Sequence, residues 1–271
     1  MFELVTLANG ARAVRHTGHG EVMHPAVGPW VEAREVYVRQ SRLEEVLCVP
    51  GPPLVLLDVG LGAGTNAVAA LTAAAALGAR RRRAMHVWSI DHARDPLRLA
   101  LADDAGFPFL VPWRAQAEAL LSRGEADGDG YQWRLVLGDL KQVLARQQTP
   151  AAEVVFFDPF SPAANPTLWT EETLTALRSR CAADASVFTY SASTATRVSF
   201  LLAGFFVGAG VATGSKGETT VAATSLSRLA SPLGARWRER WERSSRRAPH
   251  GAAELTPDVE ARIRNHPQFA P

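Results

Sequence analysis

The feature that most constrains the fold is a series of short apolar runs that each close on an aspartate. The first, residues 54–59, contains only Leu, Val and one acid, and such runs are typical of central parallel strands covered on both faces. Similar runs recur along the chain and alternate with stretches of helical spacing. The aspartates that close four successive runs are Asp58, Asp91, Asp139 and Asp158. This alternation predicts an α/β fold with a parallel, doubly wound sheet.

The last two predicted strands, residues 205–211 and 219–224, are joined by residues 212–218 alone. That connection is too short for a helical crossover, so we expect the final pair to be antiparallel. The sequence therefore predicts a seven-stranded sheet, mostly parallel with one antiparallel strand. This is the arrangement of the class I (Rossmann-like) methyltransferases.

Segments on both sides extend this core. An Asn9-Gly10 pair between two extended runs predicts a hairpin, and a helix is expected over 31–46. We divide the chain into an N-terminal hairpin and helix extension packed on the core (1–50), a core domain whose predicted sheet resembles that of class I methyltransferases (51–227), and a basic C-terminal helix and tail (228–271). The composition of the tail is compatible with disorder.

The basic C-terminal segment has two interpretations. Seven arginines stand against two glutamates between Arg228 and Arg247. Such a patch can bind anions. The alternative is a solvated amphipathic helix with Trp237 and Trp241 packed inward.

Composition excludes several classes of protein. With 271 residues, 47% apolar and 21% charged, the chain is neither disordered nor a coiled coil, and no run is long enough to cross a membrane. Cys48 and Cys181 cannot build a disulfide framework or a thiolate metal cluster, and we expect no metal. Residues 1–20 lack a secretory signal, so a cytoplasmic location is expected. The sequence does not determine the oligomeric state.

Ligands of open parallel sheets lie beyond the carboxyl ends of the strands, which is where the four aspartates should gather. The loop after the first strand carries Gly60, Gly62 and Gly64, directly after Asp58. Dinucleotide enzymes prefer the spacing G-x-G-x-x-G, whereas this loop has G-x-G-x-G. An acid before the loop can hold the cationic amino-acid end of S-adenosylmethionine but would repel a pyrophosphate. The loop therefore favours S-adenosylmethionine over NAD.

The next two aspartates are candidates for the rest of that cofactor. Asp91 is placed to accept hydrogen bonds from the ribose hydroxyls, and Asp139 from the adenine amino group. Each has a structural alternative: Asp91 as a surface acid at a strand end, and Asp139 as the N-cap of the helix 140–147. For Asp139 both roles are compatible.

A proline-rich loop after the fourth strand is the most specific feature of the sequence. It reads FFDPFSP over residues 156–162, then Asn165-Pro166 and Leu168-Trp169-Thr170. A carboxylate at Asp158 could orient an attacking amine and take up its proton, or it could simply cap the loop. Phe160 and Trp169 offer aromatic faces to a base or a cation, although Trp169 could equally anchor the loop in the core.

These motifs resemble the methyltransferase domain of MnmC-type tRNA-modifying enzymes, in the stand-alone form without the FAD oxidase domain. The proline-rich loop carries the resemblance, and LDVGLGAGTN, which ends in Asn66, is similar to the cofactor loop of that family. Residues 24–33, with Glu32, and residues 214–218, with Lys216, are similar to its N-terminal and late glycine/lysine segments. The chain departs from the family at Pro159, where fused members commonly have Gly, and at Asp58, where Glu is frequent.

The resemblance implies S-adenosylmethionine-dependent N-methylation of the 5-aminomethyl group of wobble (2-thio)uridine, with tRNA as partner. It places Asp158 at the methyl-transfer site and Glu32 and Lys216 near the substrate. The implied cofactor-binding residues are Asp58, Gly60, Gly62, Gly64, Asn66, Asp91 and Asp139.

Three other functions stay open at this stage. The chain could methylate a small amine or a natural-product intermediate. It could be a non-catalytic methyltransferase-like fold that binds RNA or a protein partner. A hydride-transfer enzyme is disfavoured by the glycine spacing and by the row of acids.

Overall fold

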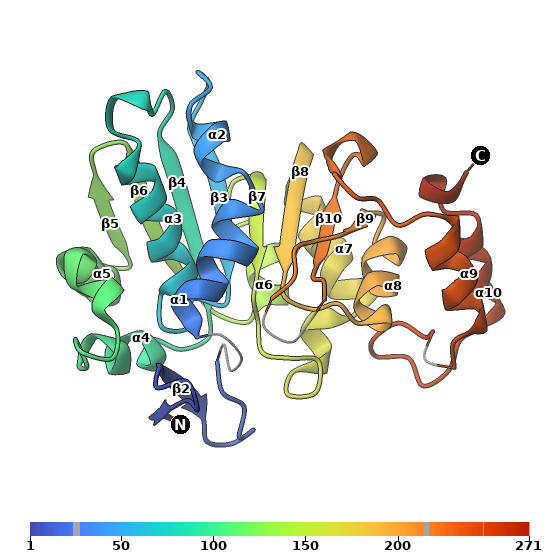
Figure 1. Ribbon diagram of the computed structural model, residues 1–271, viewed down its shortest axis with the longest axis horizontal. Coiled ribbons are helices and arrows are strands. Elements are labelled where there is room, and N and C mark those ends of the chain that lie inside the picture. The colour runs from blue at the N-terminus through green and yellow to red at the C-terminus, as the bar shows by residue number, and fades with distance from the viewer. Residues whose placement is uncertain (24–27, 214–216, 246, 271) are drawn as a thin grey trace.

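The computed structural model describes residues 1–23, 28–213, 217–245 and 247–270, and its centre is one mixed sheet (Figure 1). Within these ranges the sheet has eight strands in the order β5-β6-β4-β3-β7-β8-β10-β9. Their bounds are β3 Leu54–Val59, β4 Met85–Asp91, β5 Glu125–Gly128, β6 Tyr131–Leu137, β7 Ala152–Phe157, β8 Cys181–Thr189, β9 Phe206–Ala209 and β10 Thr220–Ala223.

The parallel core predicted from the apolar runs is confirmed. Strand β3 pairs in parallel with β4 and β7, β4 pairs with β6, and β7 with β8. The last pair, β9 and β10, is antiparallel as expected, and β10 is inserted between β8 and β9. The carboxyl ends of the parallel strands therefore meet along one edge of the sheet.

The predicted strand count is wrong by one. The additional strand is β5, Glu125–Gly128, which lies in a segment rich in Gly and Asp and is antiparallel to β6 at the edge of the sheet. Glu, Asp and Gly are poor strand formers, so propensity hid this strand. Cross-strand ion pairs from Arg134 to Asp127 (2.6 Å) and to Glu125 (3.4 Å) help to hold it.

Helices cover both faces of the sheet, as Figure 1 shows. One core contains Leu56 and Phe156, and the opposite core contains Leu57 and Phe157, because successive strand residues point to opposite faces. The first face is covered by α1 Pro29–Glu32, η1 Ala33–Arg39, α2 Leu43–Leu47, α3 Thr65–Ala76, α4 Asp95–Leu101 and α5 Arg114–Arg123, and the second by α6 Leu140–Ala145, α7 Glu171–Ser179 and α8 Thr194–Leu202. Short 3₁₀ turns are η2 Gly78–Arg80, η3 Pro108–Trp113, η4 Pro166–Trp169, η5 Leu226–Arg228 and η6 Pro267–Phe269.

The helix expected over 31–46 is interrupted. A π-helical segment, η1, follows α1, and Arg42 adopts a left-handed backbone (φ 53°) before α2 begins. Within η1, Val36, Tyr37 and Val38 are all buried. The wider π-helical turn thus places three consecutive side chains in the interior, and π-helical turns are frequent at functional sites.

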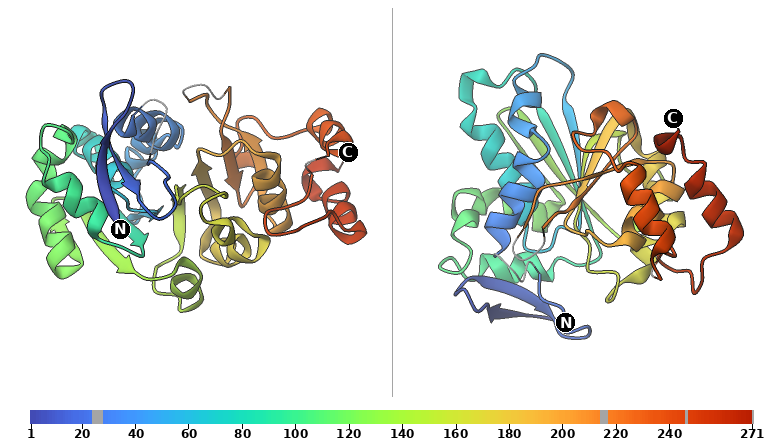
Figure 2. Two further views of the ribbon diagram at one scale, coloured as in Figure 1. Left: turned by 90° about the horizontal axis from the view of Figure 1, so that it is seen from below. Right: turned by 45° about the vertical axis from the view of Figure 1, so that its right-hand side comes forward.

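The N-terminal hairpin is confirmed, with β1 (Phe2–Thr6) paired to β2 (Arg12–His16). Gly10 has φ 82°, the left-handed conformation that a tight hairpin turn needs. An ion pair from Arg12 to Asp103 (2.9 Å) ties the hairpin to the segment after α4. In the view from below, the hairpin lies in front of the edge where the parallel strands end (Figure 2).

The C-terminal segment is ordered in its described part, which corrects the composition-based view of the tail. Helices α9 (Ala235–Arg243) and α10 (Pro257–Arg264) pack beside α8 (Figure 1). The Gln268 side chain donates to the carbonyl of Val207 (2.6 Å) and accepts from its N–H (2.6 Å). Trp237 and Trp241 are buried, as the amphipathic interpretation requires. None of the helices in the described ranges has the length and apolar content of a membrane span.

Candidate active site

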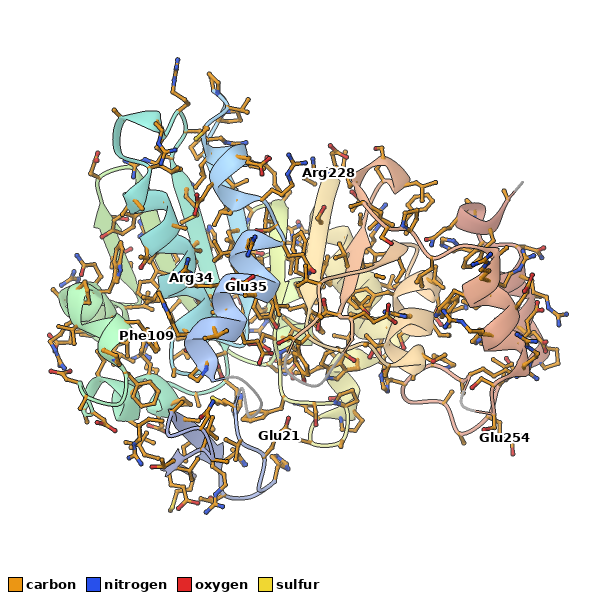
Figure 3. The ribbon with its side chains drawn as sticks, in the orientation of Figure 1. Glu21, Arg34, Glu35, Phe109, Arg228 and Glu254 are labelled. Carbon is orange, nitrogen blue, oxygen red and sulfur yellow. The ribbon has the colours of Figure 1, made fainter. Side chains whose placement is uncertain are left out.

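A cavity of about 420 Å³ opens at the edge where the parallel strands end. Its described lining contains five carboxylates and neither lysine nor arginine: Glu21, Glu32, Asp91, Asp139 and Asp158. Glu21 comes from the segment after the hairpin (Figure 3) and Glu32 from α1, whereas the three aspartates follow strands β4, β6 and β7. Three of the four aspartates predicted to gather at this edge are therefore brought together.

The glycine loop forms one wall of the cavity. Gly60 (φ 92°) and Gly62 (φ 51°) line it, and both have positive φ. A Cβ on Gly60 would lie 2.5 Å from the carbonyl oxygen of Asp158, and one on Gly62 would lie 3.1 Å from Sδ of Met23. Glycine is thus required both by the backbone and by the close approach of two other segments. Gly64, the residue before α3, is not part of the lining and instead packs toward Leu97 of α4.

Asp91 is bound to the glycine loop. Its Oδ2 accepts from the N–H of Gly62 (2.9 Å) and its Oδ1 from the N–H of His92 (2.7 Å). The same carboxylate raises the pKa of the His92 ring through a hydrogen bond. Asp91 therefore fixes the shape of the loop and also faces the cavity.

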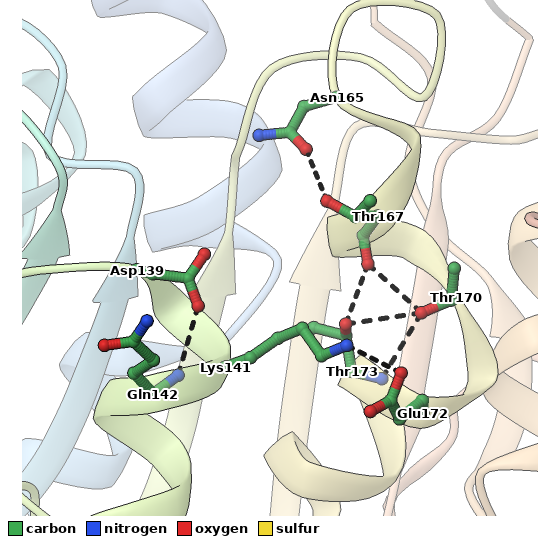
Figure 4. Close-up of polar contacts among 8 residues, drawn as sticks. All are labelled: Asp139, Lys141, Gln142, Asn165, Thr167, Thr170, Glu172 and Thr173. Atoms are coloured by element: carbon green, nitrogen blue, oxygen red, sulfur yellow. Dashed lines mark hydrogen bonds and ion pairs between the residues drawn. The ribbon is translucent and has the colours of Figure 1, made fainter.

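Asp139 both caps a helix and lines the cavity. Its Oδ1 accepts from the N–H of Gln142 (3.2 Å) at the start of α6 (Figure 4). Figure 4 also shows the neighbouring cap of α7, where Thr170 Oγ1 accepts from the N–H of Thr173. The helix-cap alternative for Asp139 is thus confirmed, and its position at the cavity keeps it available to a ligand.

Asp58 departs from the expected arrangement. Its side chain is fully buried and is not part of the cavity lining. Oδ2 accepts from Ser89 Oγ (2.7 Å), which in turn accepts from Trp133 Nε1 (3.0 Å). Burial raises the pKa of Asp58 to about 8, and the charges of Asp158 and Asp91 act in the same direction. The expected direct contact of Asp58 with the cofactor is therefore absent from this geometry, because the carboxylate lies beneath the glycine loop.

Asp158 and Asn66 form one unit. Nδ2 of the buried Asn66 donates to Oδ2 of Asp158 at 2.7 Å. Asn66 was predicted to bind cofactor, but the structure places it behind Asp158 and outside the cavity lining. The buried hydroxyl of Tyr37 also lies near Asp158, since burial first, and then the charges of Asp158 and Glu32, raise the pKa of Tyr37 well above its usual value.

Four hydrogen bonds hold the proline-rich loop. Tyr190 Oη donates to the carbonyl of Pro159 (3.1 Å), and Trp169 Nε1 donates to that of Phe160 (2.9 Å). Glu21 accepts from the N–H (2.9 Å) and the hydroxyl (3.0 Å) of Ser161. The loop that carries Asp158 is thus held by Tyr190, which follows β8, by Trp169 of η4 and by Glu21 of the N-terminal segment.

The two aromatic candidates separate. Phe160 lines the cavity and is half-buried. Trp169 is completely buried, with its ring packed edge-on against Phe157 (5.1 Å) and Tyr190 (5.8 Å). The prediction that Trp169 offers a face to substrate therefore does not fit this structure, and its alternative role as a core anchor does. Lys216, and residues 24–27 of the N-terminal segment, lie outside the described residues.

Sequence reasoning missed Glu21 and Tyr190, which both line the cavity. Tyr190 directly follows strand β8, so the rule that found the aspartates at strand ends could have found it. Glu21 lies in a loop rich in glycine and histidine, far from the glycine loop in sequence. No local pattern marks it, because only the fold of the hairpin brings it to the cavity.

The residues present fit S-adenosylmethionine. The cofactor carries a cationic sulfonium and a cationic amino group, and the carboxylate-rich lining favours both. Gly60 and Gly62 leave room for close approach of a ligand, while Asp91 and Asp139 supply acceptors for hydroxyl and amino groups. These residues would hold the adenosine part, and the acids around Asp158 would face the sulfonium.

Comparisons with known proteins point to the same cofactor. A family model described as S-adenosyl-L-methionine-dependent methyltransferase matches residues 111–225. The chain is 30% identical over 231 residues to the tRNA 5-methylaminomethyl-2-thiouridine biosynthesis bifunctional protein MnmC of Methylibium petroleiphilum, covering 80% of this chain and 34% of that protein. It is 32% identical to the protein of the same name from Paracidovorax citrulli, covering 69% of this chain and 30% of the relative. The chain thus spans about a third of the length of the curated relatives it matches.

Among solved structures, the chain is similar to MnmC2 from Aquifex aeolicus. The TM-score is 0.73 at 24% identity, and the match covers 96% of this chain and 80% of the other. At this identity the likeness establishes the fold. It confirms the class I α/β architecture predicted from the strand pattern.

Proposed function

We propose that this chain, which belongs to the S-adenosyl-L-methionine-dependent methyltransferase family, methylates an amine. The proposed acceptor is the 5-aminomethyl group of a wobble (2-thio)uridine in tRNA. The observation that carries the proposal is the cavity lining, which has five carboxylates and, in the described residues, neither lysine nor arginine. A primary amine arrives largely as an ammonium ion, so this lining attracts it. A phosphate or pyrophosphate would be repelled, which argues against a hydride-transfer enzyme.

Asp158 is the proposed catalytic residue. When bound, S-adenosylmethionine supplies a methyl group on a cationic sulfur, which a nitrogen lone pair displaces. The amine must be neutral to attack, and a carboxylate beside it can accept its N–H hydrogen bond, take up its proton and direct its lone pair. The hydrogen bond from Asn66 and the rigid proline-rich loop keep the Asp158 carboxylate in one orientation. Glu21 and Glu32 add negative charge that retains the substrate amine in the cavity.

Two observations support tRNA as the substrate. The curated relatives are named for biosynthesis of a modified tRNA uridine, which would place the activity in the cytoplasm. Helix α9 also presents Arg236, Arg240 and Arg243, all exposed, at a spacing of four and three residues. Residues at that spacing share one side of a helix, so they are positioned to contact RNA phosphates outside the acidic cavity.

The test is mass spectrometry of wobble nucleosides after incubation of the protein with S-adenosylmethionine and aminomethyl-bearing tRNA. We expect a mass increase of one methylene at that nucleoside. Methylation of small amines with none on tRNA would favour the small-molecule alternative. Calorimetry with S-adenosylhomocysteine is the companion measurement, since no binding at millimolar ligand would indicate a non-catalytic fold.

A further inference from the structure

Five aromatic rings gather at the rim of the cavity, and the proposed chemistry uses none of them. We call this cluster the ring row; it consists of Phe2, His16, His19, His92 and Phe160. Phe160 and His92 line the cavity, and the other three belong to the N-terminal hairpin and the turn that follows it. The row therefore connects the cavity to the outer surface.

The rings are fixed in place by their contacts. His16 and His19 stack with centroids 4.5 Å apart and an interplanar angle of 23°. His16 also meets Phe160 edge-on at 5.7 Å and Phe2 at 4.8 Å. The backbone N–H of His19 donates to Nδ1 of His16 at 3.2 Å, which fixes the orientation of the inner ring. Burial, and then the neighbouring His19, lower the pKa of His16.

The outer end of the row is open to solvent. His19 is exposed, between the exposed Gly18 and Gly20, whereas His16 is half-buried beneath it. A row that runs from a cavity lining to an exposed flat ring offers a surface for a planar ligand. Proteins recognise single-stranded RNA loops by stacking unstacked bases on such aromatic or histidine rings. If the acids of the cavity bind the aminomethyl group of one base, the next base in the RNA would lie at the rim of the cavity. The ring row occupies that rim.

We propose that the ring row is a stacking subsite for the nucleobase next to the methylated uridine, with His19 as the outer platform. The inference rests on the proposed function, because it assigns the ligand to a single-stranded RNA loop. It adds a specificity element: a substrate with a flanking base would bind better than the isolated modified nucleoside.

The first test compares His19→Ala, His19→Phe and a control, His86→Ala, which removes a histidine on β4 outside the cavity lining. We expect His19→Ala to raise the KM for aminomethyl-bearing tRNA about tenfold, since stacking on one ring contributes that much or more per base. His19→Phe should restore it because it keeps the flat ring, and the control should match the wild type. The KM for the isolated nucleoside and for S-adenosylmethionine should not change. An unchanged KM for tRNA in His19→Ala, or an equal change with the nucleoside, overturns the proposal.

A binding measurement separates this inference from the proposed function. The probe is an anticodon stem-loop RNA that carries 2-aminopurine next to the wobble position, whose fluorescence falls when it stacks. Wild type and His19→Phe should quench it on binding, and His19→Ala should quench it much less. Quenching that depends on His19 without any methylation would refute the proposed reaction yet support the subsite. Methylation with quenching independent of His19 would do the reverse.

Discussion

Two loops that follow neighbouring strands share one sequence pattern but place their aspartates differently. The glycine loop after β3 and the proline-rich loop after β7 both begin with an aspartate at the end of an apolar run. Asp58 is fully buried, whereas Asp158 lines the cavity. Asp58 still belongs to β3 and accepts from Ser89, which in turn accepts from Trp133. Asp158 instead follows the last residue of β7, in a loop whose Pro159 carbonyl accepts from Tyr190.

This contrast assigns the two loops different tasks. In the glycine loop, the backbone of Gly60 and Gly62 lines the cavity, and Asp58 is buried beneath it. The proline-rich loop presents its acid directly and holds it rigidly. Substitutions in the two loops should therefore have different signatures.

The largest expected effect comes from Asp158→Asn. The amide cannot take up a proton from the amine, so we expect kcat to fall at least 100-fold. The affinity for S-adenosylhomocysteine should stay within about threefold, because the cofactor does not depend on that proton transfer. Single-turnover kinetics and calorimetry measure the two quantities, and full activity in this variant would refute the role of Asp158.

An intermediate effect is expected from Gly60→Ala, which tests the close contact between the glycine loop and the backbone of Asp158. The new Cβ would need φ near 92° and would meet the Asp158 carbonyl at 2.5 Å. We expect about 1–3 kcal/mol of lost stability and at least tenfold weaker binding of S-adenosylhomocysteine. Gly204→Ala is the matched control, since Gly204 has φ 82° with open space around its Cβ position. Gly204→Ala should lose stability but keep its affinity for S-adenosylhomocysteine. Equal affinity in both variants would contradict the proposal that Gly60 lines the cofactor site.

The smallest effect on turnover is expected from Asp58→Asn, with activity within a few-fold of wild type. Its signature is the pH dependence of stability. The folded-state pKa of about 8 lies above the ordinary value of 3.8 for an aspartate, so between these values the folded state keeps a proton that the unfolded state has lost. This carboxyl therefore lowers the free energy of unfolding as pH rises from about 4 to about 8, by up to about 1.4 kcal/mol per pH unit.

Asp58→Asn should remove that contribution. Urea unfolding between pH 5 and pH 8.5 gives the slope in both proteins. Identical slopes would show that Asp58 is ionised inside the folded protein, and would thus remove the distinction between the two loops.

The sequence predicted the fold more completely than it predicted the site. Apolar runs and their spacing predicted the parallel core, the antiparallel last pair and the N-terminal hairpin. Strand β5 was not predicted because Glu, Asp and Gly disfavour strands; in the structure it pairs with β6 and carries ion pairs to Arg134. For the site, the sequence predicted that Asp91, Asp139 and Asp158 lie close together, and all three line the cavity. It did not predict that Asp58 and Trp169 are buried.

By itself, the sequence determined which residues end at the ligand edge, because parallel strands bring their carboxyl ends together whatever the loops do. Only the tertiary structure decided which of them face the cavity. Side-chain exposure depends on partners far away in the chain: Ser89 and Trp133 cover Asp58, Phe157 and Tyr190 enclose Trp169, and the hairpin delivers Glu21. Those contacts depend on packing between distant segments, which local spacing does not encode.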